Sequence, residues 1–112
     1  MIKLSFLTSL FVVGILNISF AHSPSSISAT VNEGTVDVVV EHSVANPSNH
    51  YVKLILIKVN QEEVGKKEFS SQESNDTQTA SFEISGLKPA DEIEISAFCS
   101  RIGSITKTIV VE

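Results

Sequence analysis

Three histidines and one cysteine are the side chains of this sequence with the chemistry to bind a transition metal. They are His22, His42, His50 and Cys99. Imidazole nitrogen together with thiolate sulfur suits iron, copper or zinc better than magnesium or calcium. Taken singly, an inward histidine is more often a hydrogen-bonded core residue, and a lone buried cysteine behaves as a small hydrophobe. The four residues form no short motif such as Cys-x-x-Cys, so a metal site is predicted only if the fold brings them together.

Residues 1–21 have the pattern of a secretory signal peptide. Lys3 precedes an apolar run over residues 4–16, and Ser19-Phe20-Ala21 places small residues at the two positions that signal peptidase reads. The alternative, an uncleaved membrane anchor, is disfavoured because the run is short and is interrupted by polar residues. We expect cleavage after Ala21, which leaves no membrane anchor and makes His22 the first residue of a periplasmic or extracellular protein.

The remaining residues, 22–112, are enough for one small domain. The chain has 8 Lys and Arg residues against 13 Asp and Glu residues, a net charge of −5, and its longest basic run is the pair Lys66-Lys67. A protein that binds nucleic acid normally has a basic patch, so that class is excluded. A single cysteine cannot form an internal disulfide. In an exported protein such a thiol is expected to be buried, reactive or bound to a metal.

Apolar and polar residues alternate with a period of two through nearly all of the chain after Ser25, which predicts β-strands. The alternation is clearest in residues 35–42, 79–84 and 92–99, and a last strand is expected over 105–111. Residues 51–59 are almost continuously apolar, as in a central strand packed on both sides. Turn-forming stretches follow at intervals of roughly ten residues, so the sequence predicts an immunoglobulin-like antiparallel β-sandwich of about seven strands.

The four candidate ligands lie at the ends of these predicted strands or at the new N-terminus. His42 ends one strand, His50 opens the next, and Cys99 precedes a glycine-containing turn. Because alternate strand ends of a sandwich meet at one pole, we expect these side chains to converge there.

The residues quoted so far resemble the iron-binding domain of desulfoferrodoxin and neelaredoxin, the superoxide reductase family. The resemblance rests on His22-Ser23-Pro24, His42 after a valine-rich strand, His50-Tyr51-Val52, and Ala97-Phe98-Cys99 before a glycine turn, and it extends over the whole of residues 22–111. It implies an immunoglobulin-like sandwich that holds one non-haem iron under four histidines and one axial cysteine thiolate. By this resemblance His22, His42 and His50 are iron ligands, Cys99 is the thiolate, and one position is open for superoxide.

The sequence departs from the family at two places that matter for activity. The family's fourth histidine falls three residues after the cysteine, where this chain has Ile102. The family's Glu-Lys pair before the first histidine would fall at Phe20 and Ala21, inside the signal peptide. A His₃Cys set can still hold a metal, and the terminal amine of His22 could replace the missing imidazole. Superoxide reduction also needs positive potential, for which Lys53 and Arg101 are the nearest candidates.

Three functions follow as hypotheses. The first is an exported, iron-binding oxidoreductase of the superoxide reductase type, which receives electrons from a small donor protein. The second is a non-catalytic periplasmic carrier of copper that binds through its N-terminal histidine. The third is a metal-free interaction module that resembles the sulfur-oxidation carrier proteins in architecture alone. The sequence assigns no catalytic residue and gives no indication of the oligomeric state.

Overall fold

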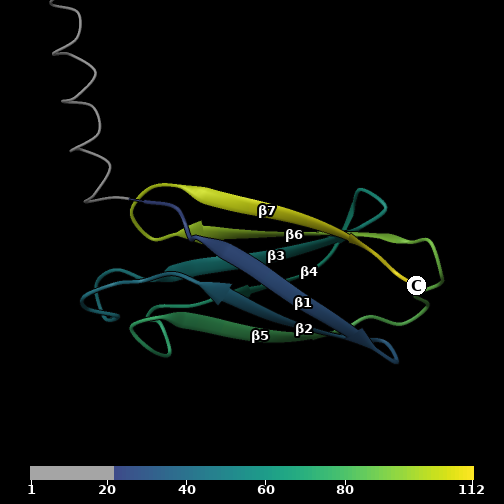
Figure 1. Cartoon of the computed structure of the whole chain (residues 1–112), viewed down its shortest axis with the longest axis horizontal. Helices are drawn as coiled ribbons and strands as arrows, with labels where there is room; N and C mark the ends of the chain where they lie inside the picture. Colours follow the sequence, from purple (N-terminus) through teal and green to yellow (C-terminus); the bar gives the residue numbers. More distant parts are fainter. Residues whose placement is uncertain (1–21) are drawn as a thin grey trace, which may run out of the picture.

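The computed structural model describes residues 22–112, and the predicted signal peptide lies outside the described residues (Figure 1). The described chain forms seven strands and no helix, so none of it is a helix long and apolar enough to cross a membrane. The strands are β1 (Ser26–Asn32), β2 (Thr35–Glu41), β3 (Val52–Val59), β4 (Glu62–Glu68), β5 (Thr77–Glu83), β6 (Glu92–Cys99) and β7 (Ser104–Val110).

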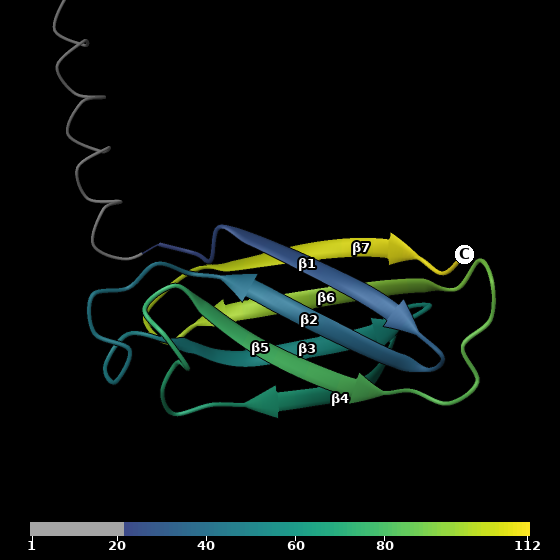
Figure 2. The same cartoon turned by 60° about the horizontal axis from the view of Figure 1, so that its bottom comes forward.

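These strands form two antiparallel sheets that pack face to face. One sheet has the order β1-β2-β5 and the other has the order β4-β3-β6-β7. Figure 2 shows the three-stranded sheet crossing in front of the four-stranded one. The predicted immunoglobulin-like β-sandwich is confirmed.

The core consists of the side chains that alternate inward from both sheets. In β2 and β6 the inward face is the one that the period-two pattern predicts, because each inward side chain there is almost fully buried. The buried apolar core residues of the strands are Ile27, Val36, Val38, Val40, Val52, Ile55, Ile57, Phe82, Ile93, Ile95 and Ala97.

Strand β3 differs from its prediction. Val52, Ile55 and Ile57 are buried, but Leu54 and Leu56 on the other face are only partly buried. The strand is central in its sheet, yet in the described chain no second layer covers the outer face of that sheet. Strand β3 is therefore packed fully on one side, not on both.

Strand β4 carries almost no apolar alternation, and its residues are mostly exposed. It forms because a two-residue turn folds it back on β3, and the turn residues Asn60 and Gln61 have φ values of 50° and 75°. Two successive positive φ values are typical of the type I′ turn, whose twist matches that of a hairpin. Pairing with β3 thus compensates for the missing hydrophobic pattern.

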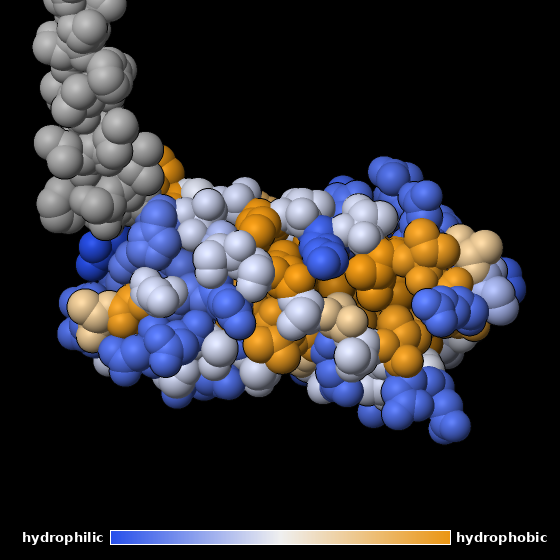
Figure 3. Space-filling view, viewed as in Figure 1, coloured by the Kyte–Doolittle hydropathy of each residue, from blue (hydrophilic) through white to orange (hydrophobic). Residues whose placement is uncertain are grey.

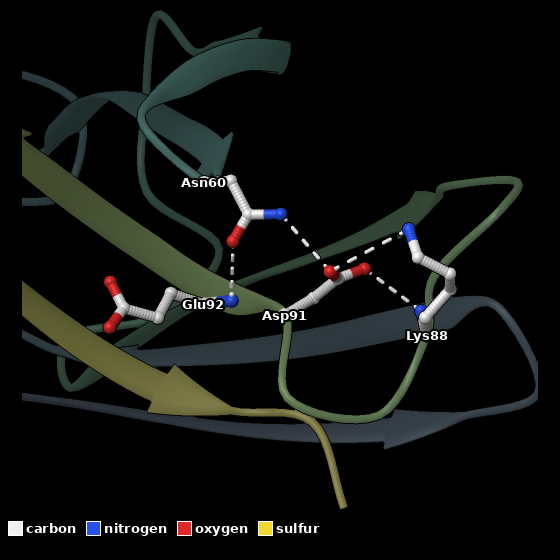
Figure 4. Close-up of polar contacts among 4 residues, drawn as sticks. All are labelled: Asn60, Lys88, Asp91 and Glu92. Carbon is white, nitrogen blue, oxygen red and sulfur yellow. Dashed lines mark hydrogen bonds and ion pairs between the residues drawn. The ribbon is translucent and has the colours of Figure 1, made fainter.

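The end of the sandwich at the β3–β4 turn is held by a network of polar contacts around Asp91 (Figure 4). The Asn60 side-chain amide donates to Asp91 Oδ1 at 3.0 Å, and the Lys88 backbone N–H donates to Asp91 Oδ2 at 2.8 Å. Lys88 Nζ lies 3.9 Å from Asp91 Oδ1. These contacts lower the pKa of the Asp91 carboxyl, chiefly through the hydrogen bond from the Lys88 backbone.

Apolar surface gathers on one side of the molecule, over β1 and β7 in the view of Figure 3. These strands are edges of different sheets, and a shallow groove of about 500 Å³ lies between them. Ala29, Val31, Leu87, Pro89 and Ile109 are among the residues that line it. The groove is on the side wall of the sandwich, and none of the three histidines lines it.

Candidate metal centre

The three histidines converge at one pole of the sandwich, where β1 and β3 begin and β2 ends, which is the left end of these strands in Figure 1. His42 directly follows β2, His50 lies two residues before β3, and His22 lies four residues before β1. The ring centroids are 4.9 Å apart for His42 and His50, 5.1 Å for His22 and His42, and 5.3 Å for His22 and His50. One donor nitrogen from each ring lies within 4.8 Å of the other two. The fold therefore brings together residues separated by up to 28 positions.

His42 is completely buried, and its ring is oriented by Gln72 in the loop between β4 and β5. The Gln72 Nε2 group donates to two carbonyl oxygens, those of His42 at 2.8 Å and Ser74 at 2.9 Å, which fixes the orientation of the amide. Gln72 Oε1 is then the acceptor, and it lies 2.9 Å from His42 Nδ1. Because that oxygen can only accept, His42 Nδ1 carries the proton, and the lone pair is on Nε2.

His50 is also buried, with 7% of its surface exposed. Its backbone N–H donates to the Asn46 carbonyl at 3.1 Å, which closes the loop that leads into β3. Burial lowers the pKa of the His50 imidazole, and the nearby His42, Arg101 and His22 lower it further. Burial therefore favours the neutral form of His50, which is the form that binds metal ions.

Two nitrogen atoms at this pole, His42 Nε2 and His50 Nε2, are buried and have no hydrogen-bond partner. Leaving a buried polar atom unpaired costs about 1–3 kcal/mol, so two such atoms side by side require an explanation. A metal ion bound by both nitrogens provides one. Three nitrogens bound to one ion at about 2.1 Å each lie about 3.0–3.6 Å apart, whereas the donor atoms of the three histidines are up to 4.8 Å apart, so the rings must move inward by roughly 1–2 Å to bind one ion.

His22 is held in place from two sides. Its Nε2 lies 3.1 Å from the Ser43 carbonyl oxygen, to which it donates. The next residue, Ser23, packs against Gly103 so closely that a Cβ on Gly103 would lie 2.8 Å from the Ser23 nitrogen and 2.9 Å from its Cα. Gly103 also has a φ of +105°, which favours glycine. The glycine turn thus allows the N-terminal segment to reach the cluster.

Cys99 is buried at the same pole, at the end of β6. Its Sγ accepts a hydrogen bond from the Arg101 backbone N–H at 3.4 Å. In the sheet Cys99 pairs with Val52, whose N–H donates to Gln72 Oε1. Among the described residues, however, the donor group within 4.8 Å comprises the three histidines and does not include the Cys99 sulfur. The thiol is a neighbour of the histidine cluster.

Arg101 is a cation close enough to His50 to lower its pKa. Its Nη2 lies 3.5 Å from both the backbone oxygen and the side-chain oxygen of Asn49, the residue before His50. Ile102, the position that the family resemblance would assign to a fourth histidine, is 62% exposed. In the described chain the donor group consists of imidazoles and contains no carboxylate. The group itself therefore carries no negative charge.

Sequence reasoning missed Gln72. It lies in the polar stretch between β4 and β5, where one glutamine among serines and acidic residues gives no signal of its role. Its contact with His42 joins residues 30 positions apart, and only the packing of the β4–β5 loop over the pole brings them together.

No protein-family model matches this chain, and no curated protein sequence matches it either. Its fold is similar to that of a superoxide reductase. The solved structure is that of a superoxide reductase (neelaredoxin) from Ignicoccus hospitalis, and the match covers 88% of this chain and 87% of that one, with a TM-score of 0.52. The two sequences are 16% identical, so the similarity is one of fold. The resemblance that the sequence suggested therefore has structural support at the level of the β-sandwich.

Proposed function

We propose that this chain is an exported, mononuclear iron-binding protein of the superoxide reductase type. The observation that carries the proposal is the pair of buried, unpartnered nitrogens, His42 Nε2 and His50 Nε2, beside a third imidazole. The similarity of fold to a superoxide reductase supports the same conclusion. Export follows from the signal-like pattern of residues 1–21, and places the protein in the periplasm or outside the cell.

In this proposal His22, His42 and His50 hold the metal, and Cys99 supplies a thiolate after a local adjustment. Iron in such a site would provide the single electron that, with two protons from solvent, converts superoxide to hydrogen peroxide, and a small donor protein would restore that electron. The residues of the chain have definite tasks. Gln72 keeps the lone pair of His42 on Nε2, burial favours the neutral form of His50, and the Arg101 side chain gives positive potential beside the Asn49–His50 segment.

Metal binding and superoxide reduction make different demands on this chain. The three imidazoles are sufficient for binding. Reduction of an anion also benefits from positive potential, and the chain has a net charge of −5 with Ile102 in place of a fourth histidine. We therefore expect iron binding to be retained and superoxide turnover to be slow.

Metal analysis of protein exported by its own signal tests the proposal. We expect about one iron per chain and, after oxidation, a visible ferric–thiolate absorption band that disappears in Cys99→Ser. Iron that stays bound in His42→Ala, or an absorption band that survives in Cys99→Ser, would contradict the assignment of ligands. A chain that holds no stoichiometric metal would favour the third hypothesis, a metal-free interaction module.

A copper carrier is the second candidate, and one observation favours it. The donor atoms that lie together are three imidazole nitrogens, and the cysteine sulfur is outside this group. Imidazole suits copper as well as iron, and a carrier needs no open position and no positive potential. One copper per chain, together with no consumption of superoxide, would support this candidate over the first.

A further inference from the structure

The ring of His22 has its free nitrogen on the side of its own backbone. Nε2 donates to the Ser43 carbonyl oxygen at 3.1 Å, and a carbonyl oxygen can only accept. In a neutral imidazole the other nitrogen, Nδ1, then carries the lone pair. His22 thus differs from His42, whose Nδ1 is used by Gln72 and whose lone pair is on Nε2.

This difference has a consequence for chelation. Nδ1 is separated from the backbone nitrogen of the same residue by Cα, Cβ and Cγ, so one ion bound to both atoms closes a six-membered ring. Nε2 is one atom further away on the far side of the imidazole and cannot close such a ring. In an internal residue this backbone nitrogen is an amide that carries a proton and has no available lone pair. In an N-terminal residue it is an amine, which can donate a lone pair to a metal.

The structure also holds the backbone next to this nitrogen at the pole. Ser23 N and Cα pack against Gly103, and the Ser25 N–H donates to the Glu41 carbonyl at 2.7 Å, immediately before His42 in the chain. These contacts hold the segment that follows His22 at the pole, and none of them involves the residue before His22.

We propose that cleavage after Ala21 makes the α-amine of His22 a metal ligand, which chelates together with His22 Nδ1 beside His42 Nε2 and His50 Nε2. The site would then have four nitrogen donors from three residues, and the amine would take the place of the fourth histidine that the chain lacks at position 102. The inference rests on the proposed metal site and adds to it a fourth nitrogen donor, which is available only when the N-terminus is free at His22.

The experiment compares two chains that differ only in whether the α-amine of His22 is free. Residues 22–112 contain both sheets and the whole described core, so both chains begin at His22, one with a free α-amine and its matched control with that amine acetylated. Both keep all three imidazoles and Cys99, but only the first has an amine on His22. Cu(II) added to the metal-free proteins is the probe, with affinity measured by competition with a chelator and the donor set by electron paramagnetic resonance. Circular dichroism confirms that both chains are folded.

We expect the chain with the free α-amine to bind Cu(II) about 100-fold more tightly than the acetylated control, since a second donor on the same residue acts at high effective concentration. Its resonance spectrum should differ from that of the control. Equal affinities and identical spectra would overturn the amine ligand and leave the imidazole site intact. If neither chain binds more tightly than its His42→Ala variant, the proposed metal site itself is wrong. Mass spectrometry of the exported protein is a separate test, since an N-terminus other than His22 rules out the chelate.

Discussion

His42 Nδ1 lies 2.9 Å from Gln72 Oε1, and this contact decides which nitrogen of a fully buried imidazole has a free lone pair. The glutamine amide cannot rotate without losing its bonds to the His42 and Ser74 carbonyls. Gln72 thus acts on the candidate centre through His42, and does not belong to the donor group itself. Replacing a group that hydrogen-bonds to a metal ligand typically changes metal affinity by about 10–100-fold.

The first prediction follows from that contact. In Gln72→Leu the His42 ring loses its hydrogen-bond acceptor, so both neutral tautomers become populated and metal affinity falls by about 10–100-fold. Nitrogen-15 NMR of the imidazole in the metal-free protein measures the tautomer directly. Gln78→Leu is the matched control, because Gln78 is equally buried but hydrogen-bonds to Glu73 and Thr79 and not to a histidine. Equal loss of affinity in both variants would show that Gln72 has only a structural role.

The second prediction concerns the approach of Ser23 to Gly103. Gly103→Ala places a methyl group 2.8–3.0 Å from three Ser23 atoms, in a backbone region that side chains rarely adopt. We expect a loss of about 1–3 kcal/mol in the free energy of unfolding and weaker metal binding, because His22 must move. Chemical denaturation and metal competition measure the two effects.

Gly86→Ala is the control for Gly103→Ala. Gly86 has a similar φ of +82°, but a Cβ there would meet no atom within 4 Å. The Gly86→Ala variant should therefore lose stability through backbone strain alone and keep its metal affinity. Unchanged metal binding in both variants would show that the Ser23 contact does not position His22.

The third prediction is a conflict between stability and metal binding at His50. His50→Phe removes a buried, unpartnered nitrogen and keeps an aromatic ring in its place. In the absence of metal we expect the variant to be at least as stable as the natural protein, with a gain of up to about 1–3 kcal/mol, while its metal binding is lost. A large loss of stability in the metal-free variant would mean that the Nε2 atom is satisfied in the folded protein.

The fourth prediction is the pH dependence that His50 adds to folding. Burial, followed by the charges of neighbouring groups, lowers its pKa in the folded state below the ordinary value of 6.5. The unfolded chain therefore takes up a proton first as the pH falls. The stabilisation is fully present above pH 6.5 and is lost as the pH falls from 6.5 through the folded-state pKa. Unfolding free energies of the metal-free protein between pH 7.5 and pH 5 should fall more steeply than those of His50→Phe, and parallel curves would contradict this.

The fifth prediction concerns the opposite pole, where Asp91 accepts hydrogen bonds from Lys88 and Asn60. These lower the pKa of the folded-state carboxyl below 3.8. The carboxylate therefore stabilises the fold above pH 3.8, and this contribution is lost as the pH falls through the lowered pKa. Asp91→Asn should be less stable than the natural protein at pH 7, with a smaller difference near pH 2.

Glu92→Gln is the control for Asp91→Asn, because the Glu92 side chain points away from Asn60 in Figure 4. The difference in stability between the natural protein and Glu92→Gln should change little from pH 7 to pH 2. A difference between natural protein and Asp91→Asn that stays constant from pH 7 to pH 2 would contradict the role of the Asp91 charge.

Much of the fold was readable from the residues because a β-strand places alternate side chains on opposite faces. This rule identified the inward faces of β2 and β6, including His42 and Cys99. It gave no indication of β4, because pairing through the Asn60–Gln61 turn, and not burial, forms that strand. The continuously apolar run of residues 51–59 overstated the burial of β3, since such a run cannot show whether a second layer covers the sheet.

The sequence by itself determined the number of ligand-type residues, their position at strand ends and the inward direction of His42. These properties depend on local periodicity and turn chemistry, which a linear chain displays directly. Tertiary structure alone decided that three imidazoles meet within 4.8 Å, that the Cys99 sulfur is outside this group, and that Gln72 and the Ser43 carbonyl select the free nitrogens of His42 and His22. Such contacts join residues 21 and 30 positions apart, and they depend on how two sheets pack, a property that no single segment of the chain contains.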